Sequence, residues 1–252
     1  MGWSRNRHKV EVQTVSAPKG GRFQESLLGW RPWRGALRSP GRLLAGLLIA
    51  DLLFVLMHVL HKQALPAFAD ISFMVTLEGG YGERFQYLKE VSIAVMLGFL
   101  ASRHRSALFA AWALVFFYLL LDDSLSVHER LGSWLAGVLG FQAALGLRAV
   151  DFGELLVSGV VAGGFVLLIA TLALRSTARM RRLCVDYLQL LALLVFFGVV
   201  VDMLHVIGKD YGLRGLGLLE DGGEMLAMSL ITAYTFWQCR REQAFLKRRQ
   251  GA

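Results

Sequence analysis

The sequence has little charge for its length: 18% of its 252 residues are charged, while 55% are hydrophobic. A soluble domain of this size needs more charged surface to stay dissolved. Prolines are also few, only four, and the apolar residues fall in long blocks. Blocks of about 20 apolar residues are long enough to cross the ~30 Å hydrocarbon core of a bilayer. The sequence therefore predicts an integral membrane protein.

Cysteine is scarce too, and the N-terminus lacks a secretory signal. Cys184 and Cys239 both fall near predicted cytoplasmic helix ends, so we expect neither a disulfide nor a cysteine metal motif. Residues 1–41 are basic and contain no apolar core followed by a cleavage site, which excludes a signal peptide. We interpret them as a basic cytoplasmic segment.

Six apolar blocks of spanning length follow this segment, at residues 42–62, 84–102, 106–129, 151–174, 183–207 and 222–239. Residues 134–147 are apolar but short and glycine-rich, which favours an interfacial or re-entrant piece over a seventh span. The predicted fold is an all-α, polytopic bundle of six transmembrane helices over residues 42–239. Residues 240–252 form a basic tail, which we expect to touch anionic lipid headgroups.

The basic residues predict the orientation. The net charge is +8, but Lys and Arg are divided among the connections rather than gathered on one face, which excludes nucleic acid as a partner. Twenty of them fall on the side that holds both termini and seven on the other. Positive charge favours the cytoplasm, so both termini are expected inside, in the inner membrane of a bacterium. Membrane lipids are the expected partners, and the sequence identifies no protein partner.

The acids and histidines within the blocks gather in the outer half of this predicted membrane. Ionisable side chains are costly there and are candidates for function. With Lys89 and Ser124 beside them, the set is Asp51, His58, His61, Glu83, Glu90, Asp122, Asp123, His128, Glu129, Glu154, Asp202, His205 and Glu224. Asp151, Glu220 and Asp221 fit helix N-terminal caps instead. The inner half is expected to be nearly free of buried charge.

The same residues suggest a threefold repeat of helical hairpins. The first helix of each hairpin ends in an Asp followed by a His, and the second begins with Gly-Glu. The three Gly-Glu dipeptides end at Glu83, Glu154 and Glu224, which are 71 and 70 residues apart. Duplication of one hairpin predicts that equivalent residues pack around a pseudo-threefold axis.

Such packing would create a metal site. His58, His128 and His205 are the expected imidazole ligands, joined by carboxylates of Glu83, Glu154, Glu224 and Asp51. Imidazole combined with carboxylate favours zinc, iron or manganese. Asp122, Asp123, Ser124 and Asp202 are the candidate catalytic residues, as orienting partners of the imidazoles or as a general base.

Three functions fit this constellation. The first is a membrane metalloenzyme, a hydrolase or oxidoreductase, acting on a lipid or other hydrophobic substrate. The second is a transporter or a proton or metal conduit. Against it, the sequence places no matching polar groups in the inner half to complete a path, and it shows no obvious broken helices. The third is a non-catalytic subunit of a larger membrane complex, holding haem or acting as a scaffold.

Two resemblances bear on this choice. Ser124 and His128, four residues apart, together with Asp202, resemble the alkaline ceramidase and adiponectin-receptor group of membrane zinc hydrolases. That family's paired His-x-x-x-His near the last helix is missing, and six spans replace its usual seven. The runs 122–132, 81–89 and 201–205 also resemble an uncharacterised family of bacterial multi-pass membrane proteins. The second resemblance implies the six-span fold and carries no activity.

Overall fold

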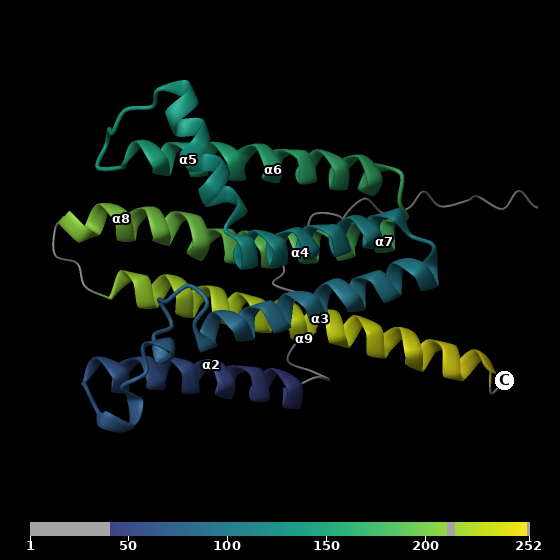
Figure 1. The fold of residues 1–252 in the computed structure, drawn as a ribbon. Coiled ribbons are helices and arrows are strands. Elements are labelled where there is room, and N and C mark those ends of the chain that lie inside the picture. Colours follow the sequence, from purple (N-terminus) through teal and green to yellow (C-terminus); the bar gives the residue numbers. More distant parts are fainter. Residues whose placement is uncertain (1–40, 211–214, 251–252) are drawn as a thin grey trace, which may run out of the picture. The chain divides into compact units, whose positions relative to one another are not determined.

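The computed structural model describes residues 41–210 and 215–250, all within one unit, Arg31–Ala252 (Figure 1). The predicted basic N-terminal segment lies outside the described residues except for Gly41. Over the described residues there is no strand, only an isolated bridge between Ala144 and Leu147. The main helices are α2 (Gly41–Lys62), α3 (Tyr81–His104), α4 (Ala107–Leu125), α5 (Val127–Leu139), α6 (Ala149–Leu174), α7 (Ala178–Val195), α8 (Asp202–Asp210) and α9 (Leu216–Gln250). The all-α fold class is confirmed.

Three of the helices reproduce the predicted blocks closely. α2, α3 and α6 begin within three residues of the predicted starts and end within two of the predicted ends. The α2–α3 connection holds two short 3-10 turns, η1 (Pro66–Phe68) and η2 (Ile71–Phe73). α9 differs, because it begins at Leu216 and continues through the predicted tail to Gln250. The boundary expected at residue 239 therefore falls inside a continuous helix.

The predicted third span, 106–129, is wrong at its end because the helix breaks at Ser126. Ser126 adopts a left-handed backbone conformation with φ 49°, so α4 ends at Leu125 and α5 starts in a new direction at Val127. The Asp122 carboxylate accepts a hydrogen bond from the backbone N–H of His128 at 2.9 Å. This bond satisfies one of the unpaired donors at the start of α5. His128 and Glu129 therefore belong to α5, and their helical spacing from residues of α4 is lost.

The predicted fifth span contains an irregularity that the sequence analysis did not anticipate. Between α7 and α8 the chain forms a π-helix, η3 (Phe196–Val201). π-helical segments are rare, and they frequently occur at functional sites. This one directly precedes Asp202, and a Cβ atom at its Gly198 would overlap the Glu224 carboxylate of α9. The irregular turn therefore brings the backbone of this helix against an acidic side chain.

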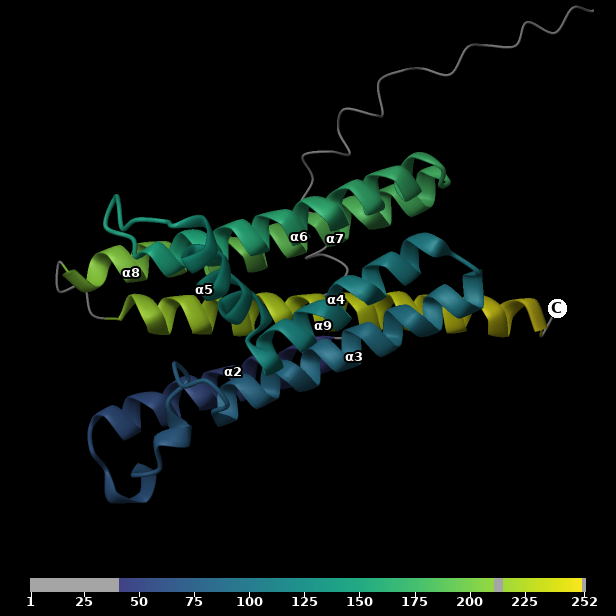
Figure 2. The same cartoon turned by 45° about the horizontal axis from the view of Figure 1, so that its top comes forward.

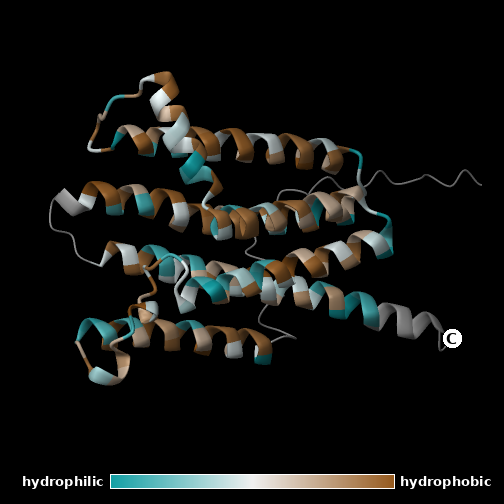
Figure 3. Cartoon of the chain, viewed as in Figure 1, coloured by the Kyte–Doolittle hydropathy of each residue, from teal (hydrophilic) through white to brown (hydrophobic). Residues whose placement is uncertain are grey.

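Four helical stretches are long and apolar enough to cross a membrane: Gly41–Lys62, Ala107–Leu125, Ala149–Leu174 and Ala178–Gly208. Figure 3 shows α6 hydrophobic along most of its length, whereas α3 and α9 carry hydrophilic stretches. Within the most apolar part of α6 only 11% of residues are buried. The apolar character of such a helix suits a surface that faces lipid.

α9 is buried over much of its length, unlike α6. It runs between α2 and α3 on one side and α7 and α8 on the other (Figures 1 and 2). From Met225 to Thr235 every residue except Leu226 is buried. Ser229, Thr232 and Thr235 are accommodated there because their hydroxyl groups hydrogen-bond inside the protein. α9 thus has low hydropathy because protein, not lipid, surrounds it.

An aromatic stack forms part of the main hydrophobic core. The Trp112 ring lies 5.3 Å from that of Tyr187, which lies 5.2 Å from that of Tyr234, joining α4, α7 and α9. The Tyr187 hydroxyl also donates to Thr235 Oγ1 at 3.1 Å. Ile93, Leu97 and Leu100 of α3 belong to the same buried cluster. The core therefore ties four helices together.

α5 and α6 meet at a close backbone contact between two glycines. A Cβ atom at Gly153 would overlap the carbonyl oxygen of Gly132, and one at Gly132 would lie 2.6 Å from the backbone nitrogen of Glu154. Small residues let helices in membranes approach in this way. The Gly153-Glu154 dipeptide thus has a packing role in the structure.

Substituting Gly153→Ala is expected to separate α5 from α6 and to destabilise the fold by about 1–3 kcal/mol through overpacking. Gly159→Ala, in the same helix, is the matched control because nothing lies within 4 Å of its Cβ position. Thermal unfolding in detergent, followed by tryptophan fluorescence, should show a lower Tm for the first variant alone. Equal Tm values for the two variants would contradict the close contact.

Candidate functional site

The most buried polar contact is an ion pair between Asp51 of α2 and Lys89 of α3. Lys89 Nζ lies 2.6 Å from Asp51 Oδ1, and both residues are buried. The ammonium also donates to Gln86 Oε1 at 2.9 Å and to the carbonyl oxygen of Met225 at 3.0 Å. Ser229 Oγ donates to the second Asp51 oxygen at 2.5 Å. The network joins α2, α3 and α9, and it engages Asp51 as a structural anion rather than as the expected metal ligand.

The histidine of α2 makes a separate contact with the α2–α3 connection. His58 Nδ1 accepts a hydrogen bond from the backbone N–H of Val75 at 3.1 Å. His61 nearby lies 2.7 Å from the carbonyl oxygen of Phe68 through its Nδ1. In the same loop, a hydrogen bond from the backbone N–H of Ser72 holds the pKa of the Asp70 carboxyl below its usual value. Both histidines therefore fasten a loop to α2.

The second histidine pairs with the end of the preceding helix. His128 Nδ1 lies 2.9 Å from Asp122 Oδ2, and Tyr118 donates to the other Asp122 oxygen at 3.3 Å. Ser124 is exposed, and its hydroxyl donates to the carbonyl oxygen of Leu120 in its own helix. The expected common face of Ser124 and His128 does not form, because the helix breaks between them at Ser126. The similarity to membrane zinc hydrolases loses this part of its geometric support.

The third histidine has the surroundings of a metal ligand. His205 Nδ1 lies 2.8 Å from Glu220 Oε2. Asp202, His205 and Glu220 each offer one ligand atom, and these atoms all lie within 4.8 Å of one another. Among the described residues this is the one group of three or more such side chains with metal-binding geometry. Its carboxyl groups, those of Glu220 and Asp202, are also hydrogen-bonded to each other.

Glu220 is a candidate ligand that the sequence pattern does not indicate, since its position fits a helix cap. In the structure α9 already begins at Leu216, so Glu220 lies inside the helix and faces His205. A Cβ atom at Gly217 would lie 2.7 Å from Cε1 of His205, which shows how closely the first turn of α9 packs on the imidazole. The four-residue spacing of Glu220 and Glu224 was the available signal.

The three glutamates of the Gly-Glu dipeptides do not share one site. Glu83 accepts hydrogen bonds from Gly79 N and, at 2.5 Å, from the Tyr87 hydroxyl, which is a capping arrangement at the start of α3. Glu154 faces His128, and Glu224 lies near Asp123 and Asp221. The three histidines likewise occupy separate contacts. The structure therefore does not bring the expected metal ligands together around one axis, because these histidines and glutamates contact other residues near each of them.

Several carboxylates do converge between α3, α4, α8 and α9. Glu90 and Asp123 lie close together, and Glu224 interacts electrostatically with both. Asp221 and Glu224 on α9 extend the set toward Asp202 and Glu220. We call these residues the acidic cluster: Glu83, Glu90, Asp123, Asp202, Glu220, Asp221 and Glu224.

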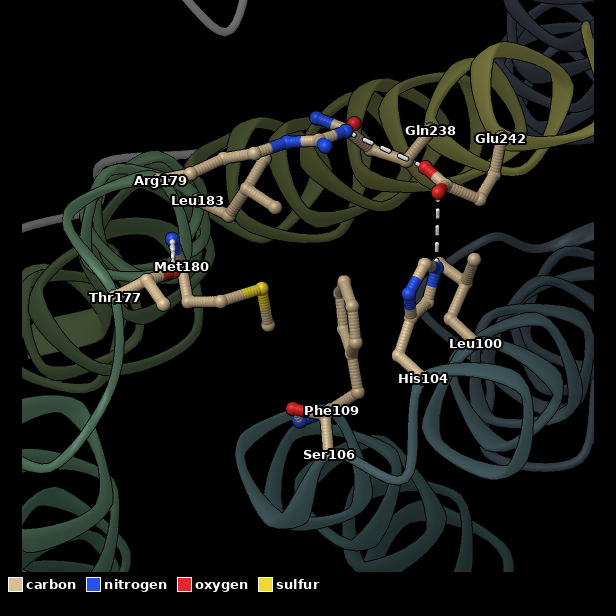
Figure 4. A pocket seen from close by; sticks show the side chains of 10 residues that line it. All are labelled: Leu100, His104, Ser106, Phe109, Thr177, Arg179, Met180, Leu183, Gln238 and Glu242. Atoms are coloured by element: carbon tan, nitrogen blue, oxygen red, sulfur yellow. Dashed lines mark hydrogen bonds and ion pairs between the residues drawn. The ribbon is translucent and has the colours of Figure 1, made fainter. Parts of the chain in front are cut away.

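Polar and charged side chains also form contacts at the opposite end of the helices, where little buried charge was expected. Tyr234 donates to Asp186 of α7 at 2.6 Å and accepts from Gln238 at 2.7 Å. Glu242 bridges His104 and Arg179, each at 3.3 Å (Figure 4). These two charged residues line a cavity of about 260 Å³ whose other lining residues are Leu100, Ser106, Phe109, Thr177, Met180, Leu183, Gln238 and Glu242 itself. Asp186 and Glu242 are half-buried and His104 and Arg179 are exposed, so these contacts do not contradict the prediction of an inner half nearly free of buried charge.

Substituting Lys89→Met should leave the Asp51 carboxylate buried without its cation and cost about 3–5 kcal/mol of stability. Adding Asp51→Asn should recover part of that loss, because the uncompensated charge is then removed. Lys62→Met, at an exposed position at the end of the same helix as Asp51, is the control. Thermal unfolding of the detergent-purified variants measures the effect, and an unchanged Tm for Lys89→Met would contradict the role of the ion pair.

Comparison with known proteins agrees with the extent of this bundle and adds no activity. No curated protein and no solved structure matches the chain. The family model described as a domain of unknown function, DUF8692, matches residues 46–239, which include every helix from α2 to α8 in whole or in large part and the buried part of α9. The chain therefore belongs to the DUF8692 family.

Proposed function

We propose that the protein is a six-span metal-binding protein of the bacterial inner membrane, and that the metal serves an enzymatic reaction on a lipid or another hydrophobic substrate. The observation that carries the proposal is the convergence of Asp202, His205 and Glu220 within ligating distance of one another. The metal would lie at the end of the bundle that faces the outer leaflet in the predicted orientation.

The proposal adds α3 and α9 to the four apolar spans. α3 has 24 residues and α9 has 35, and at 1.5 Å per residue each is long enough to cross ~30 Å of hydrocarbon. α3 lies beside α4 and α9, and α9 also lies beside α2 and α7. Their polar side chains, among them Lys89, Glu90 and Ser229, are buried in the protein. Helices in this position need not be apolar all round.

The ligand chemistry favours a transition metal. One imidazole and two carboxylates suit zinc, iron or manganese. Three protein ligands leave coordination positions for water or substrate, which is typical of catalytic rather than structural zinc sites. The carboxyl groups of Glu220 and Asp202 interact with each other, and a metal ion bound between them would offset their repulsion.

The surroundings supply the groups that metal-dependent hydrolysis needs. A bound metal ion lowers the pKa of its water and polarises a carbonyl group. Asp221 and Glu224 lie next to the ligands on α9, and one of these carboxylates would accept the proton of the attacking water. The apolar helices α6 and α7 leave large hydrophobic side chains exposed, which suits a substrate that arrives from the bilayer.

Metal content tests this proposal directly. The detergent-purified protein, reconstituted with zinc, iron or manganese, should hold about one ion per chain, since three ligands converge at one site. His205→Ala and Asp202→Asn should each lose the ion, while His61→Ala, whose imidazole bonds the α2–α3 loop, should retain it. A wild-type protein that binds none of these metals while remaining folded would refute the metal site.

The six-span topology is tested separately by cysteine accessibility. Both native cysteines are buried, so single cysteines can be introduced at exposed positions with little background. Glu78→Cys in the α2–α3 connection should react with a membrane-impermeant maleimide from outside, whereas Arg105→Cys should react only after the membrane is opened. Equal labelling of the two from one side would contradict the proposed crossing of α3.

A cation or proton conduit is the second candidate, favoured by two observations that the sequence did not provide. The acidic cluster continues from the metal ligands to Glu90, and polar contacts at Asp186 and Glu242 lie toward the other end of the helices. The π-helix at Phe196–Val201 interrupts one spanning helix beside this cluster. Uptake of metal by liposomes that contain the protein, abolished in Asp202→Asn, would favour this second candidate over the enzyme.

A further inference from the structure

Glu90 is a buried acid that the metal site does not use. It lies in α3 with 2% of its surface exposed. Its Oε2 atom is buried and has no hydrogen-bond partner among the described residues. A carboxylate in such a position has lost its hydration without full replacement by protein donors, which is costly for the ionised form.

The adjacent Lys89 donates no hydrogen bond to the Glu90 carboxyl group. Lys89 directs its ammonium away to Asp51, Gln86 and the carbonyl oxygen of Met225. An ammonium group has three donors, and these three acceptors occupy all of them. Moving Lys89 toward Glu90 would break the ion pair that joins α2, α3 and α9. Lys89 therefore interacts with Glu90 only through space and donates no hydrogen bond to its carboxyl group.

The partner that Glu90 does have is another carboxyl group. Its side chain lies close to the carboxyl group of Asp123 of α4, which is its strongest charged neighbour. Two neighbouring carboxylates repel each other when both are ionised, and burial of Glu90 strengthens that repulsion. One proton shared between the two groups removes the repulsion and supplies a hydrogen-bond donor that two ionised carboxylates lack.

The charges of the neighbouring side chains also favour a proton on the Glu90–Asp123 pair. Titratable groups from four helices surround the pair. They are Glu83, Tyr87 and Lys89 of α3, Asp122 of α4, His128 of α5 and Glu224 of α9. The Tyr87 hydroxyl donates to the carbonyl oxygen of Asp123 and to Glu83. Lys89 is committed to Asp51, and His128 to Asp122. Apart from Tyr87, the remaining groups are carboxylic acids, and acids close together in a membrane cannot all be ionised without countercharges.

We infer that the Glu90–Asp123 pair is a proton-binding site in the interior of the bundle, beside the other members of the acidic cluster. The site takes one proton, shared between the two carboxyl groups, and returns it when the pair is opened. This role is distinct from that of Asp202, His205 and Glu220 and requires no metal. The protein would therefore have two sites, one for a metal on α8 and α9 and one for a proton between α3 and α4.

Reaction with dicyclohexylcarbodiimide tests the site, because this apolar reagent modifies protonated carboxyl groups in membranes. In the full-length protein reconstituted in liposomes, peptide mass spectrometry should locate an adduct on Glu90. The adduct should be lost in Glu90→Gln. It should also decrease in Asp123→Asn, because the amide donates to an ionised Glu90 and removes the need for a proton. Glu78→Gln, which alters an exposed loop acid, should leave Glu90 labelling unchanged.

Infrared spectroscopy provides a readout that does not depend on reagent access. A protonated carboxyl group has a carbonyl stretch that a carboxylate lacks, and the intensity of this band should be lower in Glu90→Gln than in the wild-type protein. Equal band intensity in the two folded proteins, together with no adduct on Glu90 in the wild type, would overturn the proposal. The same measurements on Asp202→Asn separate the two sites: the Glu90 signals should persist there even though the metal is lost.

Discussion

The buried ion pair between Asp51 and Lys89 is the interaction on which the arrangement of the polar interior depends. Charges in a low-dielectric interior are tolerated only when they are paired and hydrogen-bonded. Here the ammonium has three acceptors, and Asp51 has Ser229 as a second donor. The contacts fix α3 and α9 at one register, since Lys89 bonds the backbone of Met225. That register brings Glu90 of α3 near Glu224 of α9.

The distribution of hydropathy follows from which helices face protein and which do not. The most apolar stretches belong to helices with little burial, such as α6, whereas α9 is buried over most of its middle. A hydropathy criterion therefore selects lipid-facing helices and passes over the central one. The same geometry explains why the acids could accumulate on α3 and α9. Those side chains meet other polar groups inside the protein rather than hydrocarbon.

The positions of the apolar blocks in the sequence predicted several helices well, but they could not predict how the side chains of those helices pair. Long apolar blocks determined where α2, α3 and α6 begin and end. The histidines behaved differently, because local partners that leave no periodic pattern, such as Val75 N and Asp122, engage them. The break at Ser126 depends on a left-handed residue that a helical spacing rule cannot anticipate. Glu220 was missed because its role depends on an α9 that starts earlier than the apolar block does.

The proposed metal ligands and the Glu90–Asp123 pair lie at two ends of the acidic cluster, and this has a thermodynamic consequence. Glu224 on α9 interacts electrostatically with members of both ends, with Glu90 and Asp123 at one and with Asp202 and Glu220 at the other. In a medium of low dielectric constant, a cation added at one end weakens the binding of a proton at the other. Such coupling is reciprocal, so loss of the proton must strengthen metal binding by the same factor. An enzyme would use this linkage to set the charge of its site, and a conduit would use it to exchange one cation for another.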